Sequence, residues 1–309
     1  MTSETKSVLL ASVAVICWAT VATAFKIALS HLSVFNMLFV ATATALVIFS
    51  VMMTLERKWG LLRRVPAKTL AFAAMLGILN PVAYYLLLFR AYDLLPAQIA
   101  QPLNYVWPVM LLVLLAVFGH KRIPAKKFIG MGLSIGGVVC ISLGGGGVEG
   151  SVSAGGIILA LASASLWAAY WLLNNILKDK IDTTVTLFLG FLAGTAVLAT
   201  AGCIRGFELA SQAGVLSGIY IGCFEMGVPF IAFGMALRIT RNPALINQMC
   251  YLSPFLSLFL ISAVLGERVV ASTYFGLALI VAGLVYNEYF ATSQSPSARI
   301  RAWRHGRQS

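Results

Sequence analysis

Residues 103–118 read LNYVWPVMLLVLLAVF, and residues 249–264 read MCYLSPFLSLFLISAV. Both stretches are long apolar runs that begin with polar and aromatic residues around a proline. When residues 103–137 are laid on residues 249–283 without a gap, identical residues coincide at Tyr105 and Tyr251, Pro108 and Pro254, Leu112 and Leu258, Arg122 and Arg268, Gly130 and Gly276, and Gly137 and Gly283. Two segments far apart in the chain share one pattern, which indicates an internal repeat.

The composition around these runs is that of a membrane protein. Hydrophobic residues make up 60% of the 309 residues and the mean hydropathy is +0.91. Charged residues make up 10%, whereas a soluble domain carries roughly a quarter. The apolar side chains therefore exceed what a soluble core of this length buries, and lipid must cover the remainder. A soluble cytosolic protein, a disordered chain and a disulfide-stapled secreted protein are excluded.

The apolar stretches predict an all-α integral membrane protein with ten transmembrane helices. Each stretch is close in length to the about 20 residues that a helix needs to cross a bilayer. A barrel strand needs only about half that number. The stretches cover residues 8–29, 34–54, 69–90, 95–118, 128–143, 156–177, 184–204, 213–235, 244–265 and 272–290.

The repeat divides these ten helices into two halves of five around a central cavity. Near the start of each half, Trp18-Ala19 lies on Trp167-Ala168. An odd number of spans forces the second half to enter the membrane upside down, and inverted repeats are typical of transporters. We therefore expect a first repeat over 1–143, a Gly-rich connection over 144–155, an inverted second repeat over 156–292, and a basic tail over 293–309.

The net charge of +12 is distributed as orientation signals. With the N-terminus inside, every Lys and Arg except Lys26, Arg90, Arg205 and Arg268 falls on the inner side. The positive-inside rule then predicts that both termini are cytoplasmic. No basic stripe with interleaved aromatic residues is available for nucleic acid. The basic loops and tail are expected to contact anionic lipid.

Several of these features together resemble a known family. They are the Trp18-Ala-Thr and Trp167-Ala-Ala openings, the stretch from Ala97 to Pro108 before an apolar helix, and Leu265-Gly-Glu-Arg268. The chain resembles the EamA branch of the drug/metabolite transporter superfamily, and most of all its bacterial aromatic amino acid exporters. The first half departs from the pattern, with His120-Lys121-Arg122 where the second half has Gly266-Glu267-Arg268.

The resemblance implies a multi-pass protein of the bacterial inner membrane that exports amino acids by alternating access. Aromatic amino acids are the expected substrates, with Thr and Met as further ones. The partners are then small molecules and the lipid bilayer, with the monomer as the working hypothesis. No cofactor, metal or enzymatic activity is expected.

Glu225 is the most prominent polar residue within a predicted span. It lies near the middle of the eighth span, between Cys223 and Met226, with no basic residue within one helical turn. An ionisable group at this depth is costly and marks function by default. We interpret it as a proton-coupling group or as the partner of a substrate ammonium group. The alternative is a structural carboxyl group.

Amides and aromatic residues complete the candidate cavity. In the fourth span, Gln101, Asn104, Tyr105 and Pro108 recur every three or four residues and so share one face, and the ninth span repeats this pattern. A polar stripe on a membrane helix must face the bundle or water. The candidate substrate-binding residues are Trp18, Asn80, Tyr84, Asn104, Tyr105, Trp167, Trp171, Glu225, Gln248 and Tyr251.

Such a lining of indole, phenol and amide groups suits a solute with an aromatic or apolar body. The alternative substrates are aromatic cations or drugs, for which Glu225 and the tryptophans would form a cation cage. An intramembrane enzyme is disfavoured, because no nucleophile, base or metal set is visible. The pairs Gly132/Gly136 and Gly190/Gly194 have the small-residue spacing of helix-packing faces.

Overall fold

The structure is a computed structural model that describes residues 2–118, 124–144, 153–174, 176–177, 180–240, 245–246 and 249–289. These residues form helices and no strand. In the first half the helices are α1 (Ser3–Leu29), α2 (Val34–Leu55), η1 (Trp59–Arg63), α3 (Ala67–Gly77), η2 (Ile78–Ala83), α4 (Tyr84–Leu94), α5 (Ala97–Asn104), α6 (Trp107–Val117) and α7 (Lys127–Gly144). In the second half they are α8 (Ala154–Asn174), α9 (Thr183–Arg205), α10 (Gln212–Ile221), η4 (Gly222–Gly227), α11 (Val228–Ile239), α13 (Leu252–Leu265) and α14 (Ala271–Tyr289).

Seven helical segments of the described chain are long and apolar enough to cross a membrane: α1, α2, α3–η2–α4, α5–α6, α8, α9 and α10–η4–α11. The apolar parts of α7, α13 and α14 are shorter, within 10–17 residues. Each of the ten predicted stretches contains helix, but the count of ten membrane crossings stays a prediction.

Polar side chains at the helix starts explain where several spans begin. Ser33, Asp182 and Ser211 each accept a hydrogen bond from a backbone N–H of the first turn of the helix that follows. These bonds satisfy donors that have no partner within the helix. At the other end of a span, Gly266 ends α13 in the left-handed conformation, with φ of 67°, which a residue with a side chain adopts at a cost.

Two predicted spans are interrupted by one turn of π-helix. The third span runs α3–η2–α4 with Pro81 inside η2, and the eighth runs α10–η4–α11 with Pro229 at the start of α11. Proline has no N–H for the helix ladder, and π-turns are common at functional positions. The same local device therefore occurs once in each half.

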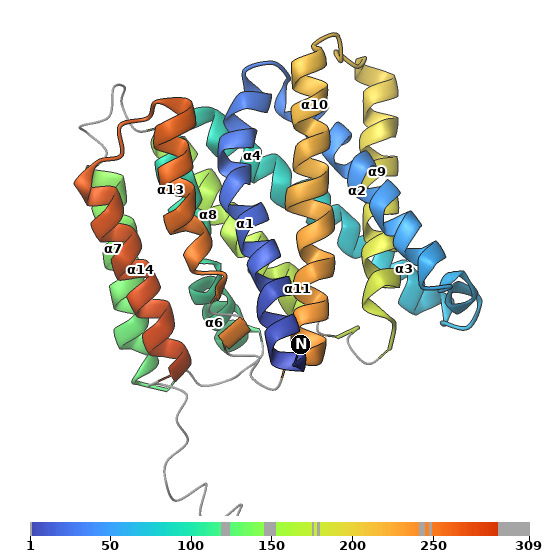
Figure 1. The fold of residues 1–309 in the computed structure, drawn as a ribbon, viewed down its shortest axis with the longest axis horizontal. Helices are drawn as coiled ribbons and strands as arrows, with labels where there is room; N and C mark the ends of the chain where they lie inside the picture. Colours follow the sequence, from blue (N-terminus) through green and yellow to red (C-terminus); the bar gives the residue numbers. More distant parts are fainter. Residues whose placement is uncertain are drawn as a thin grey trace, which may run out of the picture.

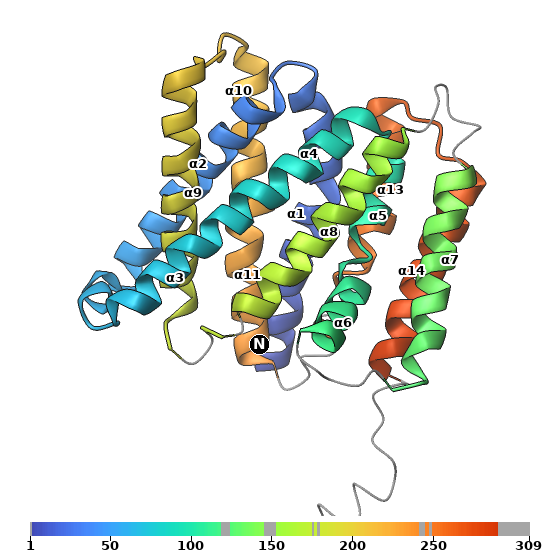
Figure 2. The ribbon, with the colours of Figure 1, turned by 180° about the vertical axis from the view of Figure 1, so that it is seen from behind.

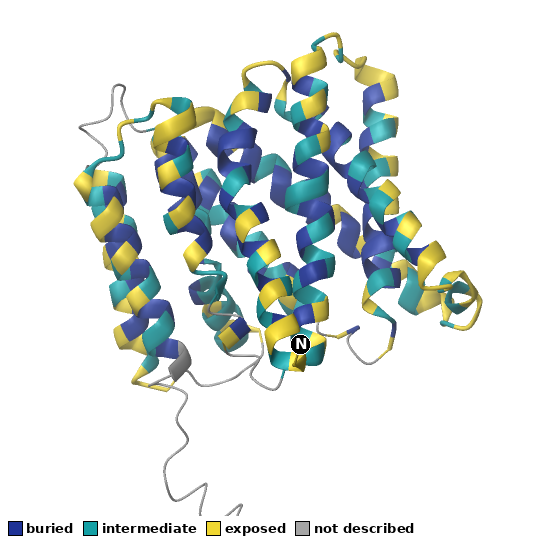
Figure 3. Cartoon of the chain, viewed as in Figure 1, coloured by how far each residue is buried: buried dark blue, intermediate teal, exposed yellow. Residues whose placement is uncertain are grey.

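The helices pack in pairs that the repeat relates to one another. The first span, α1, packs on α11 and α13, and the equivalent sixth span, α8, packs on α4 and α6. The equivalent spans α2 and α9 pack on each other. Both views show α1 beside α11 and α8 beside α4 in the middle of the molecule (Figures 1 and 2). Figure 3 shows buried residues concentrated on these central helices.

Helices α7 and α14 lie side by side at one edge (Figures 1 and 2). They approach closely at glycines: a Cβ on Gly130 would overlap the carbonyl oxygen of Gly283, and one on Gly137 would overlap that of Gly276. The sequence repeat sets Gly130 on Gly276 and Gly137 on Gly283. Gly130 therefore contacts the repeat equivalent of Gly137, and Gly137 contacts the repeat equivalent of Gly130.

One sequence interpretation is wrong here. Gly132 and Gly136 have the spacing of a packing face, but in the described part of the chain no atom of another helix lies within 4 Å of a Cβ built on either. They lie on a different face of α7 from the glycines that contact α14. The second predicted pair does pack: a Cβ on Gly194 would lie 2.9 Å from the Pro81 ring, and Gly190 is the close neighbour of Gly77.

Candidate functional site

Glu225 lies midway along the α10–η4–α11 span, within the π-turn. Pro229, four residues later, has no N–H to give the Glu225 carbonyl its α-helical hydrogen bond. The indole Nε1 of Trp18, on α1, donates to that carbonyl at 3.4 Å. A side chain of the first span thus contacts the main chain at the break in the eighth.

The carboxyl group of Glu225 has a partner on a third span. The hydroxyl of Tyr85, on α4, donates to Glu225 Oε1 at 3.1 Å. Tyr85 is fully buried, whereas Glu225 is only partly buried. Its carboxyl group is therefore held on one side by a phenol within the protein interior.

A cluster of aromatic rings adjoins this pair through Tyr85 and Trp18. The ring centroids of Tyr84 and Tyr85 are 4.5 Å apart, and those of Tyr84 and Trp167 are 4.7 Å apart. Phe230 lies 5.9 Å from Trp167 and 6.4 Å from Trp18. The rings come from α1, α4, α8 and α11, so four segments from both halves of the chain meet here.

Hydrogen bonds extend the cluster toward the fourth span. The hydroxyl of Tyr84 donates to Asn104 Oδ1 at 3.1 Å, and Asn104 Nδ2 donates to Ser163 Oγ at 2.9 Å. Asn104 is the last residue of α5, directly before the break that separates α5 from α6. The amide is therefore fixed between a phenol of the third span and a hydroxyl of the sixth.

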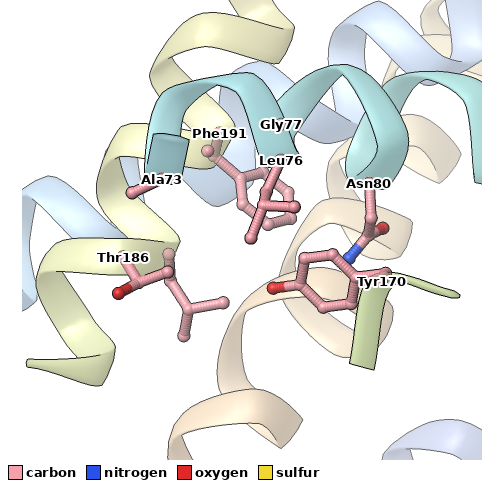
Figure 4. A pocket seen from close by; sticks show the side chains of 9 residues that line it. Ala73, Leu76, Gly77, Asn80, Tyr170, Thr186 and Phe191 are labelled. Atoms are coloured by element: carbon pink, nitrogen blue, oxygen red, sulfur yellow. The ribbon is translucent and has the colours of Figure 1, made fainter. Parts of the chain in front are cut away.

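Asn80 points to a different part of the bundle. Its side chain lines a narrow crevice between α3, α8 and α9, beside Tyr170 and across from Thr186 (Figure 4). Asn80 is 2% exposed, and among the described residues neither polar atom of its amide has a hydrogen-bond partner of good geometry. Trp167 and Tyr170 stack at 5.8 Å, so this space adjoins the aromatic cluster.

The structure brings together five of the ten predicted site residues. Trp18, Tyr84, Asn104, Trp167 and Glu225 form one continuous set of contacts. Trp171 lies at its edge, 5.8 Å from Trp167 and 37% exposed.

The remaining predicted residues lie at helix breaks or outside the structure. Tyr105 falls in the break between α5 and α6, and Tyr251 directly before α13, and both are half-buried. Gln248 lies outside the described residues. Their part in the site stays a prediction.

The candidate substrate-binding residues chosen from the sequence omit four members of the cluster, which are Tyr85, Ser163, Tyr170 and Phe230. Tyr85 and Tyr170 stand out as aromatic residues in the sequence, but nothing in the sequence separates them from lipid-facing aromatic residues. Ser163 and Phe230 carry no signal of their own.

Ionic and polar contacts join the halves at both ends of the bundle. At one end, Lys58 Nζ lies 2.6 Å from Glu56 Oε2 and 2.8 Å from Asp182 Oδ1. At the other, the carboxylate of Glu267 accepts hydrogen bonds from the backbone N–H groups of Ala97 and Gln98, at 3.0 and 3.2 Å.

The Lys58 cluster lies outside the candidate spans and shifts two acidic groups. Partial burial acts to raise the pKa of Glu56 and of Asp182, but the hydrogen bonds and positive charge of Lys58 outweigh it and lower both pKa values. The ammonium of Lys58 thus favours the ionised form of two carboxylates, one from each half of the chain.

Within the part of the chain that the structure describes, no three His, Cys, Asp or Glu side chains lie together as a metal site would require. The aromatic cluster presents one carboxyl group, phenols, an indole N–H and an amide. Groups of these kinds are chemically complementary to a protonated amine and an apolar body.

Comparison with known proteins gives a family and several relatives. The profile of the EamA-like transporter family matches residues 5–143 and 154–287. A Streptantibioticus cattleyicolor protein named "Probable terminal-alkyne amino-acid exporter" is 27% identical, over 72% of this chain and 74% of that protein. The Escherichia coli K12 protein named "Uncharacterized inner membrane transporter YedA" is 25% identical over 71% of each. A crystal structure superposes with a TM-score of 0.64 at 20% identity, covering 93% of this chain and 98% of the other, which shows a shared fold.

Proposed function

This chain belongs to the EamA-like transporter family, and on that premise we propose that it exports amino acids across the bacterial inner membrane. The expected substrates have an aromatic or apolar side chain, such as Trp and Phe, with Thr and Met as smaller ones. Transport proceeds by alternating access, without a cofactor, in a monomer surrounded by lipid.

The observation that carries the proposal is the position of Glu225. A carboxyl group halfway along a candidate span is costly in lipid. This one contacts Tyr85 and Trp18, which belong to a cluster of aromatic rings from four helices. A substrate ammonium group binds favourably between a carboxylate and aromatic faces. The site is therefore chemically suited to the α-amino group that all amino acids share.

The rest of an amino acid also finds partners nearby. Trp18, Tyr84, Trp167 and Phe230 offer ring faces for an aromatic or aliphatic side chain. Asn104 is placed beside them by its bonds to Tyr84 and Ser163, and its amide offers a polar group for the substrate carboxylate. The printed name of the Streptantibioticus relative, an amino-acid exporter, supports this substrate class.

Alternating access is supported by the packing of the two halves. The crossed contacts of Gly130 with Gly283 and of Gly137 with Gly276 are those expected if two equivalent helices run antiparallel about a pseudo-twofold axis. The paired packing of α1 and α8 follows the same relation. We propose ten spans in two inverted halves, which allow the halves to exchange conformations and open the site to either side.

The test is counterflow in proteoliposomes. Vesicles containing the purified protein are loaded with unlabelled Trp, Phe or Thr, and entry of the labelled counterpart is measured at two pH values. Saturable counterflow is expected, and Glu225→Gln should reduce it by about tenfold or more, because a hydrogen-bonded charge pair is lost. Glu208→Gln is the matched control, since Glu208 is exposed and lies outside the candidate spans.

A second substrate class is favoured by the same carboxyl group among aromatic rings. Efflux of aromatic cations would use Glu225 and the tryptophans as a cation site. If phenyltrimethylammonium shows counterflow and no amino acid does, cation efflux replaces amino acid export as the proposed function. Silence for both classes would overturn transport through this site.

A further inference from the structure

We propose that Tyr85 is a positioning residue that makes the site selective for substrates with a protonated amine. It acts through Glu225: its hydroxyl fixes one carboxyl oxygen and directs the other toward the substrate. The inference rests on the proposed function, in which Glu225 binds the ammonium group.

Glu225 is held at two points by two different spans. Tyr85, on α4, binds the side chain through Oε1 at 3.1 Å, and Trp18, on α1, binds the main-chain carbonyl at 3.4 Å. No hydrogen bond to Oε2 is present among the described residues. The carboxyl group therefore keeps one oxygen for a ligand while the other is fixed.

Tyr85 is itself rigidly placed. It is 0% exposed, and its ring packs against Tyr84 at 4.5 Å and Phe89 at 5.3 Å. A fully buried hydroxyl has little freedom to find another partner, and a buried polar group needs one. The Tyr85 hydroxyl and Glu225 therefore act as a unit.

The neighbouring tyrosine provides a matched control. Tyr84 is also buried and its ring is part of the same cluster, but its hydroxyl binds Asn104 and not Glu225. Tyr84→Phe and Tyr85→Phe each remove one hydroxyl from adjacent buried rings. They differ in whether the lost bond reaches the carboxyl group.

The first experiment uses a series of indole compounds in the counterflow assay. For each compound it measures the concentration that half-saturates counterflow or half-inhibits it. Tryptophan and tryptamine carry the amine, and indole-3-propionate lacks it. A hydrogen bond to an ionised group corresponds to about a ten- to hundredfold change in an equilibrium constant. Tyr85→Phe should therefore raise the half-saturation concentration at least about tenfold for tryptophan and tryptamine, and less than about twofold for indole-3-propionate.

The variants separate positioning from general structural damage. Glu225→Gln should show the same amine-selective loss, and the double variant should lose little more than either single variant, because both remove one coupled unit. Tyr84→Phe removes the hydroxyl that holds Asn104, so it should weaken tryptophan and indole-3-propionate, which carry the carboxylate, at least as much as tryptamine. If Tyr85→Phe folds poorly, Glu225→Asp takes its place in the experiment. It withdraws the carboxyl group by one methylene, away from the Tyr85 hydroxyl, and should weaken the amine-bearing compounds selectively.

The second measurement does not depend on transport. Infrared difference spectra between the wild-type protein and Glu225→Gln isolate the carboxyl band of Glu225. Tyr85→Phe should shift this band, and Tyr84→Phe should leave it in place.

The outcomes distinguish this inference from the proposed function. If the wild-type protein carries tryptophan but Tyr85→Phe weakens all three compounds equally, the role of Tyr85 is overturned and export stands. An unshifted carboxyl band likewise overturns the role of Tyr85. If the wild-type protein carries and binds none of the compounds, the proposed function fails and the amine selectivity fails with it.

Discussion

Gly77→Ala should destabilise the protein, because α3 and α9 touch at this glycine. A Cβ on Gly77 would overlap the carbonyl oxygen of Gly190 and lie 2.7 Å from its carbonyl carbon and 2.8 Å from its Cα. All three atoms belong to the main chain, so no side chain can rotate away. The helices must separate, which also disturbs the neighbouring contact between Gly194 and Pro81.

The magnitude follows from two opposing effects. Overpacking a close contact costs about 1–3 kcal/mol, and this overlap with main-chain atoms belongs at the upper end. Alanine in place of glycine favours a helix by about 1 kcal/mol. The free energy of unfolding should therefore fall by about 2 kcal/mol.

Gly190→Ala is the matched control on the facing helix. A Cβ there would lie 3.6 Å from the nearest atom, the Cα of Gly77, which is ordinary van der Waals contact. The free energy of unfolding should be unchanged or rise by up to about 1 kcal/mol.

Both variants can be compared with the wild-type protein by heating samples in detergent and measuring the folded fraction by size-exclusion chromatography. Gly77→Ala should lose its folded peak at a lower temperature than the wild-type protein, and Gly190→Ala should not. Equal loss in the two variants, or wild-type behaviour of Gly77→Ala, would refute the packing argument.

Further predictions concern three other contacts. Gly130→Ala should lower the free energy of unfolding by about 1–3 kcal/mol, because α7 and α14 meet at Gly130. Gly132→Ala, with open space around it, should not lower it. Equal melting temperatures of the two variants in detergent would contradict this. Asp182→Ala should cost about 1 kcal/mol more than Asp182→Asn, since only asparagine still caps α9. Because the folded-state pKa of Asp182 is lowered, its ion pair stabilises the protein fully above about pH 4, the pKa of the unfolded state. The melting temperature of the wild-type protein should therefore exceed that of Asp182→Asn at neutral pH, and this excess should vanish as the pH falls through the folded-state pKa. An excess that stays constant from pH 7 to 3 would disprove the role of the ion pair. Glu267→Gln should weaken the capping of α5 and increase proteolysis near Ala97, and unchanged cleavage would exclude that role.

The candidate site was only partly accessible from the sequence. Glu225 is conspicuous because an ionisable residue in an apolar run has a high energetic cost wherever it points. Its partner Tyr85 is not, because the two are far apart in the chain and one tyrosine in a buried helix looks like another. Which of Tyr84 and Tyr85 reaches the carboxyl group depends on the rotation of α4 after the π-turn, and local sequence does not determine that rotation.

The glycines show the same division. The sequence aligned Gly130 with Gly276 and Gly137 with Gly283, but spacing alone pointed to Gly132 and Gly136 as the packing face. Small-residue spacing indicates that one face of a helix can approach a neighbour. It does not say which face the neighbour covers.

The sequence by itself determined the membrane class, the helical elements and the family, because hydrophobic length and a repeated pattern are properties of the chain read in order. Only the tertiary structure decided that Trp18 and Tyr85 meet at Glu225, and that α7 contacts α14 through Gly130 and Gly137. Those contacts depend on how each helix is rotated about its axis and at what height it packs, which the combined packing of all the helices fixes.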